Sequence, residues 1–363
     1  MFKKRTKILT LILLMFFILC SCTSPQTDTS INSPQPTTVI PETSKFEAHF
    51  IDVGQADATL LFCDDKTMLI DGGNPDDSNV IAAYLKKHNV KHIDYLICSH
   101  AHDDHVGGLS GALSVATVGK VFAPKTENDI RSYKSFKKKL AEQHLEIKTP
   151  VCGDTFNFGI SNVLFLGPVH ENTDNLNNTS IILKITYGNT SFLFTGDAEH
   201  EEELTVIEQD IDLSADVLKV GHHGSAYSTT YLFLREIMPK YAIISVGKHN
   251  SYGHPSEQTL SRLNDADVDV YRTDIHGDIV VSSNGETITV QTDKSSSTSS
   301  NTIHTEENSV APMQYIGNKN TKKFHYPECS SVNAMKESNK VFFTCTRDEI
   351  ISEGFVACQR CNP

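Results

Sequence analysis

Four side chains that commonly bind metal ions lie within six residues of one another, directly after a hydrophobic segment. The segment IDYLIC (93–98) is typical of a buried strand, and SHAHDDH (99–105) follows it. Side chains alternate along an extended backbone, so the first two candidates share one side and the last two can turn toward a second ion. Imidazole nitrogens together with carboxylate oxygens suit zinc, manganese or iron. The candidate ligands are His100, His102, Asp104 and His105.

Three further segments place side chains of the same kind after expected strands. FTGD (194–197) ends in a carboxylate that can bridge two metals, GHHGS (221–225) carries a histidine pair, and YGHPS (252–256) carries another histidine. Each segment alone is weak evidence for a metal site, since an aspartate at a strand end more often belongs to a turn or caps a helix. Together with the first cluster they predict one metal centre. The added candidates are Asp197, His222, His223 and His254.

Strand and helix patterns are interleaved around these segments. The strands expected at 181–187 and 191–195 are joined by Gly188-Asn189, which is a hairpin signal. Helices are expected near 199–208, 229–238 and 256–264. Such interleaving favours layered sheets with helices outside, although periodicity alone does not give the topology.

The ordered segments resemble the metallo-β-lactamase superfamily, whose hallmark is a His-x-His-x-Asp-His core. The nearer match is the group related to the hydrolase domain of ComEC-type competence proteins, over about residues 46–290. The resemblance implies an α+β fold, a four-layer αβ/βα sandwich with metals at one edge of the facing sheets. It is carried by HFIDVGQADA (49–58), LIDGG (69–73), SHAHDDH (99–105), NTSIIL (178–183), TGD (195–197), HHGS (222–225) and YGHPS (252–256).

The resemblance also implies site roles, with two divalent ions, zinc or manganese. His100 and His102 would hold one ion with one histidine of the 222/223 pair, here assigned to His222, although the pair leaves this choice open. Asp104 and His105 would hold the second ion with His254, and Asp197 would bridge the two. Asp71, Asp104 and His223 would take part in catalysis, Asp71 by orienting the cluster and His223 by donating to phosphoryl oxygens. His170 does not resemble a strand-end ligand.

Hydrolysis of a phosphodiester is the reaction that this implied centre favours. Two metals ~3.5–4 Å apart can share a hydroxide and clamp both oxygens of a displaced phosphate. The metal-bound hydroxide would be the nucleophile, so no serine or cysteine nucleophile is needed. A β-lactam or a thioester could be attacked by the same centre.

The first 22 residues have the pattern of an export signal. A basic start without acidic residues precedes a twelve-residue apolar run, 8–19, which is too short for a membrane span and fits a signal peptide. The ending LCSC (19–22) resembles a bacterial lipoprotein signal in which Cys22 would carry the lipid. We therefore expect a monomer tethered to the outer face of the cell membrane, or a secreted one.

Two polar segments divide the remaining chain. Residues 23–45 and 292–313 contain too few apolar side chains to offset the entropy of ordering them, so they read as a spacer and a linker. They bound a hydrolase domain at 46–291 and a small domain at 314–363.

The small domain has the spacing of a second metal site. HYPEC (325–329) and CQRC (358–361) give a His-x₃-Cys and a Cys-x₂-Cys pair, enough for one structural zinc, with disulfides as the alternative. The segment resembles the zinc-binding domain of Ada-type alkyl-DNA repair proteins. His325 stands where that family has a first cysteine, so methyl transfer is not expected. The candidate ligands are His325, Cys329, Cys358 and Cys361; the role of Cys345 stays open.

The charge balance restricts how a polyanion could bind. The net charge of −13 argues against a broadly basic surface. We predict a surface-tethered, metal-dependent phosphodiesterase or nuclease acting on extracellular DNA. One alternative is an esterase on cell-wall or teichoic-acid phosphodiesters, such as phosphorylcholine. The other is a non-catalytic binding lipoprotein with structural metals. The native metal and the choice between exo and endo cleavage stay open.

Overall fold

The computed structural model describes residues 45–169, 174–294, 313–327, 329–345, 347–358 and 361. The expected export signal and lipidated Cys22, His170 and most of the two polar segments lie outside the described residues. Within the described residues, no helix combines the length and the apolar character that crossing a membrane requires.

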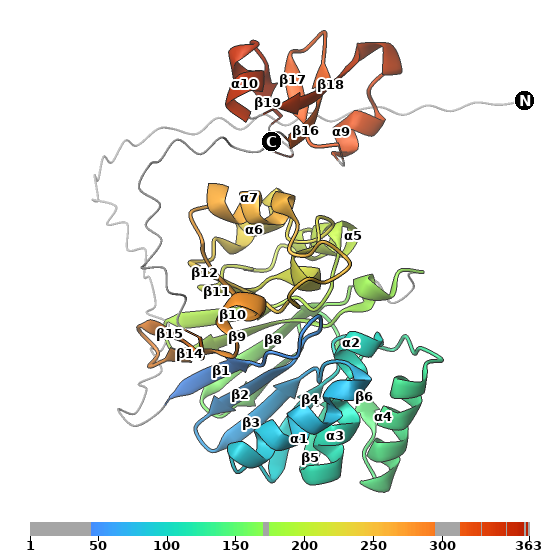
Figure 1. The fold of residues 1–363 in the computed structure, drawn as a ribbon, viewed down its shortest axis with the longest axis vertical. Helices are drawn as coiled ribbons and strands as arrows, with labels where there is room; N and C mark the ends of the chain where they lie inside the picture. Colours follow the sequence, from blue (N-terminus) through green and yellow to red (C-terminus); the bar gives the residue numbers. More distant parts are fainter. Residues whose placement is uncertain are drawn as a thin grey trace, which may run out of the picture. The chain divides into compact units, whose positions relative to one another are not determined.

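Two sheets form the larger domain (Figure 1). Among the described residues, the first sheet has eight strands, in the spatial order β15 (Ile288–Thr292), β14 (Ile279–Ser283), β1 (Phe46–Phe50), β2 (Thr59–Cys63), β3 (Lys66–Ile70), β4 (His92–Ile97), β5 (Thr117–Phe122) and β6 (Ile147–Lys148). The second has seven, in the order β13 (Asp269–Arg272), β12 (Tyr241–Ile244), β11 (Val217–Lys219), β10 (Thr190–Phe194), β9 (Ile182–Tyr187), β8 (Ser161–Gly167) and β7 (Thr155–Phe158).

Each sheet joins an antiparallel part to a parallel part. Strands β3 to β6 pair in parallel, as do β10 to β13, while β1, β2 and β3 pair antiparallel. The hairpin expected around Gly188-Asn189 is present as the antiparallel pair β9 and β10. The parallel strands of each sheet end at the same edge, so the segments that follow them can meet there.

The two sheets face each other across an aromatic core. Phe46 and Phe50 of β1 contact Phe192 and Phe194 of β10, with ring centroids 4.5 Å and 6.0 Å apart. Strand β3 shows why the first sheet is buried on both sides. Its Met68 and Ile70 point into this core, whereas Leu69 points to the opposite side, as the alternation of a strand dictates.

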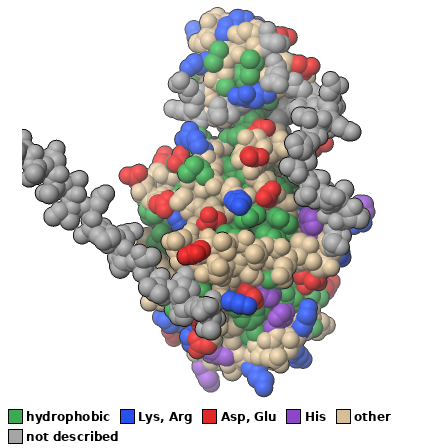
Figure 2. Space-filling model, turned by 90° about the vertical axis from the view of Figure 1, so that its left-hand side faces the viewer, with side chains coloured by type: hydrophobic (Ala, Val, Ile, Leu, Met, Phe, Trp, Pro, Cys, Tyr) green, Lys and Arg blue, Asp and Glu red, His purple; other side chains and the backbone are tan. Residues whose placement is uncertain are grey.

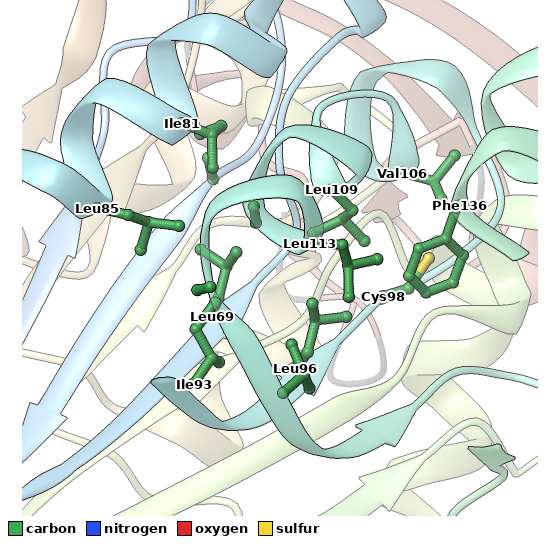
Figure 3. Packing of buried hydrophobic residues seen from close by; sticks show 14 of the residues in the cluster. Leu69, Ile81, Leu85, Ile93, Leu96, Cys98, Val106, Leu109, Leu113 and Phe136 are labelled. Atoms are coloured by element: carbon green, nitrogen blue, oxygen red, sulfur yellow. The ribbon is translucent and has the colours of Figure 1, made fainter. Parts of the chain in front are cut away.

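Helices cover the outer side of each sheet. Figure 3 shows Ile81 and Leu85, Leu109 and Leu113, and Phe136 packed over Leu69 and Leu96 of the first sheet. The four-layer arrangement expected for the chain is therefore confirmed. The first sheet carries α1 (Ser78–Lys87), α3 (Leu109–Val115) and α4 (Arg131–Glu142), and the second carries α5 (His200–Ile207), α6 (Tyr231–Ile237) and α7 (Glu257–Asp265). Shorter helices are η1 (Pro75–Asp77), α2 (Asp103–Val106), η2 (Leu176–Thr179), η3 (Gly221–Gly224) and α8 (Thr273–His276).

The C-terminal residues form a small sheet with a thin core. Its described strands lie in the order β18 (Lys340–Cys345), β16 (Met313–Asn318), β17 (Lys323–His325) and β19 (Val356–Ala357). The helices are α9 (Ser330–Asn333), η4 (Glu337–Asn339) and α10 (Arg347–Ser352). Tyr315, Phe324 and Phe355 are among its few buried apolar side chains, so little apolar burial stabilises it.

The face drawn in Figure 2 carries acidic and basic side chains in a mixed distribution. That face therefore offers no broad basic surface, in agreement with the acidic net charge.

Candidate metal centre

The metal-ligand candidates of the first sheet are placed by the parallel pairing of β3 and β4. Ile70 pairs with Ile97, so the residues that follow both strands lie side by side. The backbone N–H of Asp71 donates to the carbonyl of Ile97 at 2.9 Å, and the N–H of Ser99 donates to Asp71 Oδ1 at 2.7 Å. Asp71 is therefore fixed at the base of the histidine segment that begins at His100.

The candidates of the second sheet follow β10, β11 and β12 in the same way. Asp197 lies just beyond β10, the 222/223 pair lies in η3 beyond β11, and His254 lies in the loop after β12. Parallel strands place all three segments at one edge of their sheet. The structure thus brings both sets of candidates to one place.

Four of these side chains form a compact group of possible ligands. One atom from each of Asp104, His105, Asp197 and His223 lies within 4.8 Å of every other. The Nε2 atom of His105 is 3.2 Å from Asp197 Oδ2, and that of His223 is 3.3 Å from Asp104 Oδ2. We call these four residues the ligand group.

The remaining histidines lie around the ligand group. The Nε2 of His100 is 2.9 Å from Nδ1 of His102, and the His100 ring lies 4.1 Å from that of His105. The Nε2 of His222 is 3.7 Å from Asp197 Oδ2, and the ring of His254 lies 5.4 Å from that of His222. The structure therefore places His223 inside the ligand group and His222 beside it, next to Asp197. The sequence interpretation named His222 as the ligand and left the choice within the pair open, and that assignment stays a prediction.

A cleft of about 320 Å³ opens onto these residues. Side chains of the ligand group and of the histidines around it reach the cleft from both sheets, so the site is accessible rather than closed. The lining residues are Gln55, His102, Asp103, Asp104, Asn177, Asp197, His222, His223, Tyr252 and His254.

The side chains present fit a divalent cation. Two buried polar atoms of the ligand group, Nε2 of His105 and Oδ1 of Asp197, make no hydrogen bond within the described structure. Buried groups of this kind are normally satisfied, and a cation close to carboxylates and imidazoles satisfies them. Nitrogen and oxygen donors without sulfur suit zinc or manganese.

The ionisation of the side chains in the ligand group also favours a cation site. Burial alone would raise the pKa of Asp197, but the neighbouring His105 and His223 hold it well below its usual range. Burial would lower the pKa of His105, yet the carboxylates of Asp197 and Asp71 raise it well above its usual value. The Asp197 carboxylate is therefore ionised at neutral pH, and an ionised carboxylate is a ligand for a divalent cation.

Two imidazoles of the site, those of His105 and His222, have a carboxylate next to Nδ1. Nδ1 of His105 donates to Asp71 at 2.9 Å, and Nδ1 of His222 lies 3.3 Å from Glu199 Oε1. Such carboxylates orient metal-binding imidazoles and raise their basicity. Asp71 also accepts from the backbone N–H and the hydroxyl of Ser99, and its orienting role stays a prediction. Glu199 was missed, although its place two residues after Asp197 was an available signal.

The turn that carries the histidine pair has an unusual backbone. His222 and His223 both have left-handed conformations, with φ of 50° and 52°, a region that residues other than glycine rarely adopt. Buried Arg262 holds the following segment by donating to the carbonyls of Ala226 and Ser228 at 3.0 Å. The turn itself is held by the N–H of His222, which donates to the carbonyl of Gly196 at 3.1 Å, and by the N–H of Ser225, which donates to that of His222 at 2.8 Å.

The four C-terminal candidates also come together. One ligand atom from each lies within 4.8 Å of every other, in a site closed by the parallel pairing of β17 with β19. A hydrogen bond with Cys361, opposed by burial and aided by a hydrogen bond with His325, lowers the pKa of the Cys329 thiol to about 4. The described cysteines are free thiols, so the disulfide alternative is wrong for them. Cys345 lies outside the group, which is His325, Cys329, Cys358 and Cys361.

Comparisons with known proteins agree with this description. Residues 51–249 match the metallo-β-lactamase superfamily, and residues 300–363 match the metal-binding domain of Ada. ComE operon protein 3 of Bacillus subtilis is 32% identical over 254 residues, which cover 65% of this chain and 33% of that protein. Competence protein ComA of Neisseria gonorrhoeae is 29% identical over 228 residues, which cover 62% of this chain and 30% of ComA.

The chain thus spans about a third of the length of these curated relatives. Among solved structures, the metallo-β-lactamase fold protein YhfI from Bacillus subtilis is 14% identical with a TM-score of 0.45, covering 66% of this chain and all of that one. The resemblance to the ComEC-type group is confirmed by the competence proteins. Since the family match spans more than half of the sequence, the chain belongs to the metallo-β-lactamase superfamily.

Proposed function

We propose that this chain is a phosphodiesterase that cleaves DNA outside the cell. The observation that carries the proposal is the ligand group, which is buried at its base and open to a cleft on one side. A purely structural metal site would be closed by its ligands. The open side disfavours the alternative of a binding lipoprotein with structural metals.

We assign some residues of the site to binding cations and others to binding the substrate. Asp104, His105, Asp197 and His223 would hold one divalent cation, and His100 and His102 would hold a second beside Asp197. When bound, such cations activate water and neutralise charge on a phosphate. His222 and His254 line the cleft and would donate hydrogen bonds to the phosphoryl oxygens.

Tyr252 supports a nucleic acid as the substrate. It lies at the cleft with 72% of its surface exposed, and its ring stacks on that of His254 with centroids 5.7 Å apart. Asn250 fixes this loop, because its side chain accepts from the N–H groups of Tyr252 and His254 and donates to the Gly247 carbonyl. A rigidly presented ring of this kind can stack on a nucleobase.

The same cleft argues against the phosphorylcholine alternative. Aromatic cages that recognise a quaternary ammonium group surround it with aromatic rings. Among the described residues that line the cleft, Tyr252 is the single residue of the Phe, Tyr or Trp type, and the sequence contains no tryptophan.

The cellular location is proposed from the sequence. The basic and apolar segment before Cys22 supports export and a lipid tether, and the names of the competence relatives are compatible with DNA at the cell surface.

A direct assay tests the proposal. The chain from residue 23 onward is purified and incubated with Mn²⁺ or Zn²⁺ and linear DNA, beside Asp104→Ala and His102→Ala. We expect metal-dependent cleavage that each variant lowers at least ~100-fold. Absence of cleavage with every divalent metal would refute the nuclease proposal. Hydrolysis of bis-p-nitrophenyl phosphate without cleavage of DNA would favour the esterase.

A further inference from the structure

A buried lysine lies behind the ligand group. Lys219 ends β11 and has only 3% of its surface exposed. Its Nζ lies 2.8 Å from Oδ2 of Asp57, which is itself 4% exposed, and it donates to the carbonyl of Val220 at 3.0 Å. The two charges are therefore paired away from solvent.

Asp57 connects this lysine to the ligand group. Its other oxygen, Oδ1, lies 3.2 Å from Nδ1 of His223, and the same nitrogen donates to the carbonyl of Ser245 at 3.0 Å. Nε2 of His223 faces Asp104 and Asp197. An ammonium, a carboxylate and an imidazole thus form a continuous line that ends where the cation would bind.

Stability alone does not account for a buried ion pair at this place. Removing two charges from water costs several kcal/mol per ion, and well-packed apolar residues are often as stabilising. The pair does change what Asp57 can do. Ligand atoms of Asp57, Asp71 and His105 also lie within 4.8 Å of one another, so an unpaired Asp57 could turn and bind the cation itself.

We propose that Lys219 and Asp57 are positioning residues that hold His223 as a ligand. Asp57 stabilises the imidazole with Nε2 directed at the cation, and Lys219 keeps Asp57 in that place. The inference rests on the proposed cation site but not on the proposed substrate.

The test measures Mn²⁺ binding rather than cleavage. Mn²⁺ prefers oxygen and nitrogen ligands, so it reports on the ligand group and not on the C-terminal thiolates. The free Mn²⁺ signal in electron paramagnetic resonance gives the Kd for the chain from residue 23 onward. We expect Asp57→Asn and Lys219→Met to weaken binding 10- to 100-fold, and Lys219→Arg, which keeps the charge, to retain most of the affinity.

A second ion pair, between a buried lysine of the same sheet and the exposed Asp212, provides a control away from the cleft. Lys184 of β9 is 8% exposed and lies 2.8 Å from Asp212, and neither residue is among those that line the cleft. Lys184→Met should lower the melting temperature without changing the Mn²⁺ affinity.

The results separate positioning from general stability. If Asp57→Asn and Lys219→Met kept the Kd within threefold of the parent chain, the inference would be overturned. If Asp57→Asn does not fold, the Mn²⁺ affinities of Lys219→Met and Lys219→Arg are compared instead. Equal affinities of these two variants would also overturn the inference. A parent chain that binds Mn²⁺ but leaves DNA intact would refute the proposed function and leave this inference standing.

Discussion

Replacing Arg262 by methionine tests how much this buried side chain stabilises the segment that follows the histidine turn. Arg262 is 2% exposed, and its Nη1 donates to the carbonyls of Ala226 and Ser228 at 3.0 Å. Its charge also acts on buried Glu203, whose carboxylate accepts from the backbone of Thr229 and Thr230. Methionine keeps much of the side-chain volume but removes both the donors and the charge.

The expected loss follows from these contacts. A hydrogen bond from a charged donor contributes about 1.5–3 kcal/mol, so two of them contribute roughly 3–5 kcal/mol once overlap is allowed for. Removing one partner of a buried charge pair costs a similar ~3–5 kcal/mol. These two descriptions concern the same side chain and are not additive. We therefore expect the free energy of unfolding to fall by about 3–5 kcal/mol.

Guanidinium unfolding, followed by far-UV circular dichroism at pH 8, measures this difference. Arg235→Met is the matched control, because Arg235 lies on the surface of α6 and pairs with its exposed neighbour Glu236. It should change the free energy of unfolding by less than ~0.5 kcal/mol. A loss below ~1 kcal/mol for Arg262→Met would refute the reasoning that its two buried hydrogen bonds stabilise the fold.

Three further predictions concern pH, substrate and zinc. Burial raises the pKa of Glu203 to about 7 despite its hydrogen bonds with Thr230 and Thr229. The native state therefore keeps a proton that the unfolded chain releases near pH 4.5, so stability should fall by up to about 3 kcal/mol as the pH rises from 4.5 to 7. Glu203→Gln should flatten this slope in unfolding titrations, and an unchanged slope would disprove the assignment. Tyr252→Ala should raise KM for a single-stranded oligonucleotide about 5- to 100-fold, but not for an abasic one with the same backbone. Tyr227 is a 71%-exposed tyrosine that is not among the cleft-lining residues, so Tyr227→Ala should change KM for neither substrate. If Tyr252→Ala raised KM equally for both substrates, stacking on a base would be excluded. Cys358→Ser should remove one zinc per chain in metal analysis and expose the C-terminal domain to protease; full retention of zinc would contradict the assigned site.

The sequence by itself determined the kinds of residues in the site and their order along the chain. Metal-binding side chains after short apolar segments are local features, since the strand, the turn and the ligand lie within about ten residues of one another. The hairpin of β9 and β10 is equally local, because Gly188-Asn189 specifies the turn. The layered arrangement followed from the family resemblance, which rests on the same local segments.

The tertiary structure decided which side chains meet and which face one another. Neighbouring positions in the sequence do not distinguish His222 from His223. Their rings are separated by a left-handed backbone whose His222 N–H donates to the carbonyl of Gly196, in the segment after another strand. Asp57 and Lys219 are 162 positions apart, and only the approach of the two sheets at their common edge pairs them. Contacts between distant segments depend on how whole sheets pack, and no local pattern of residues carries that information.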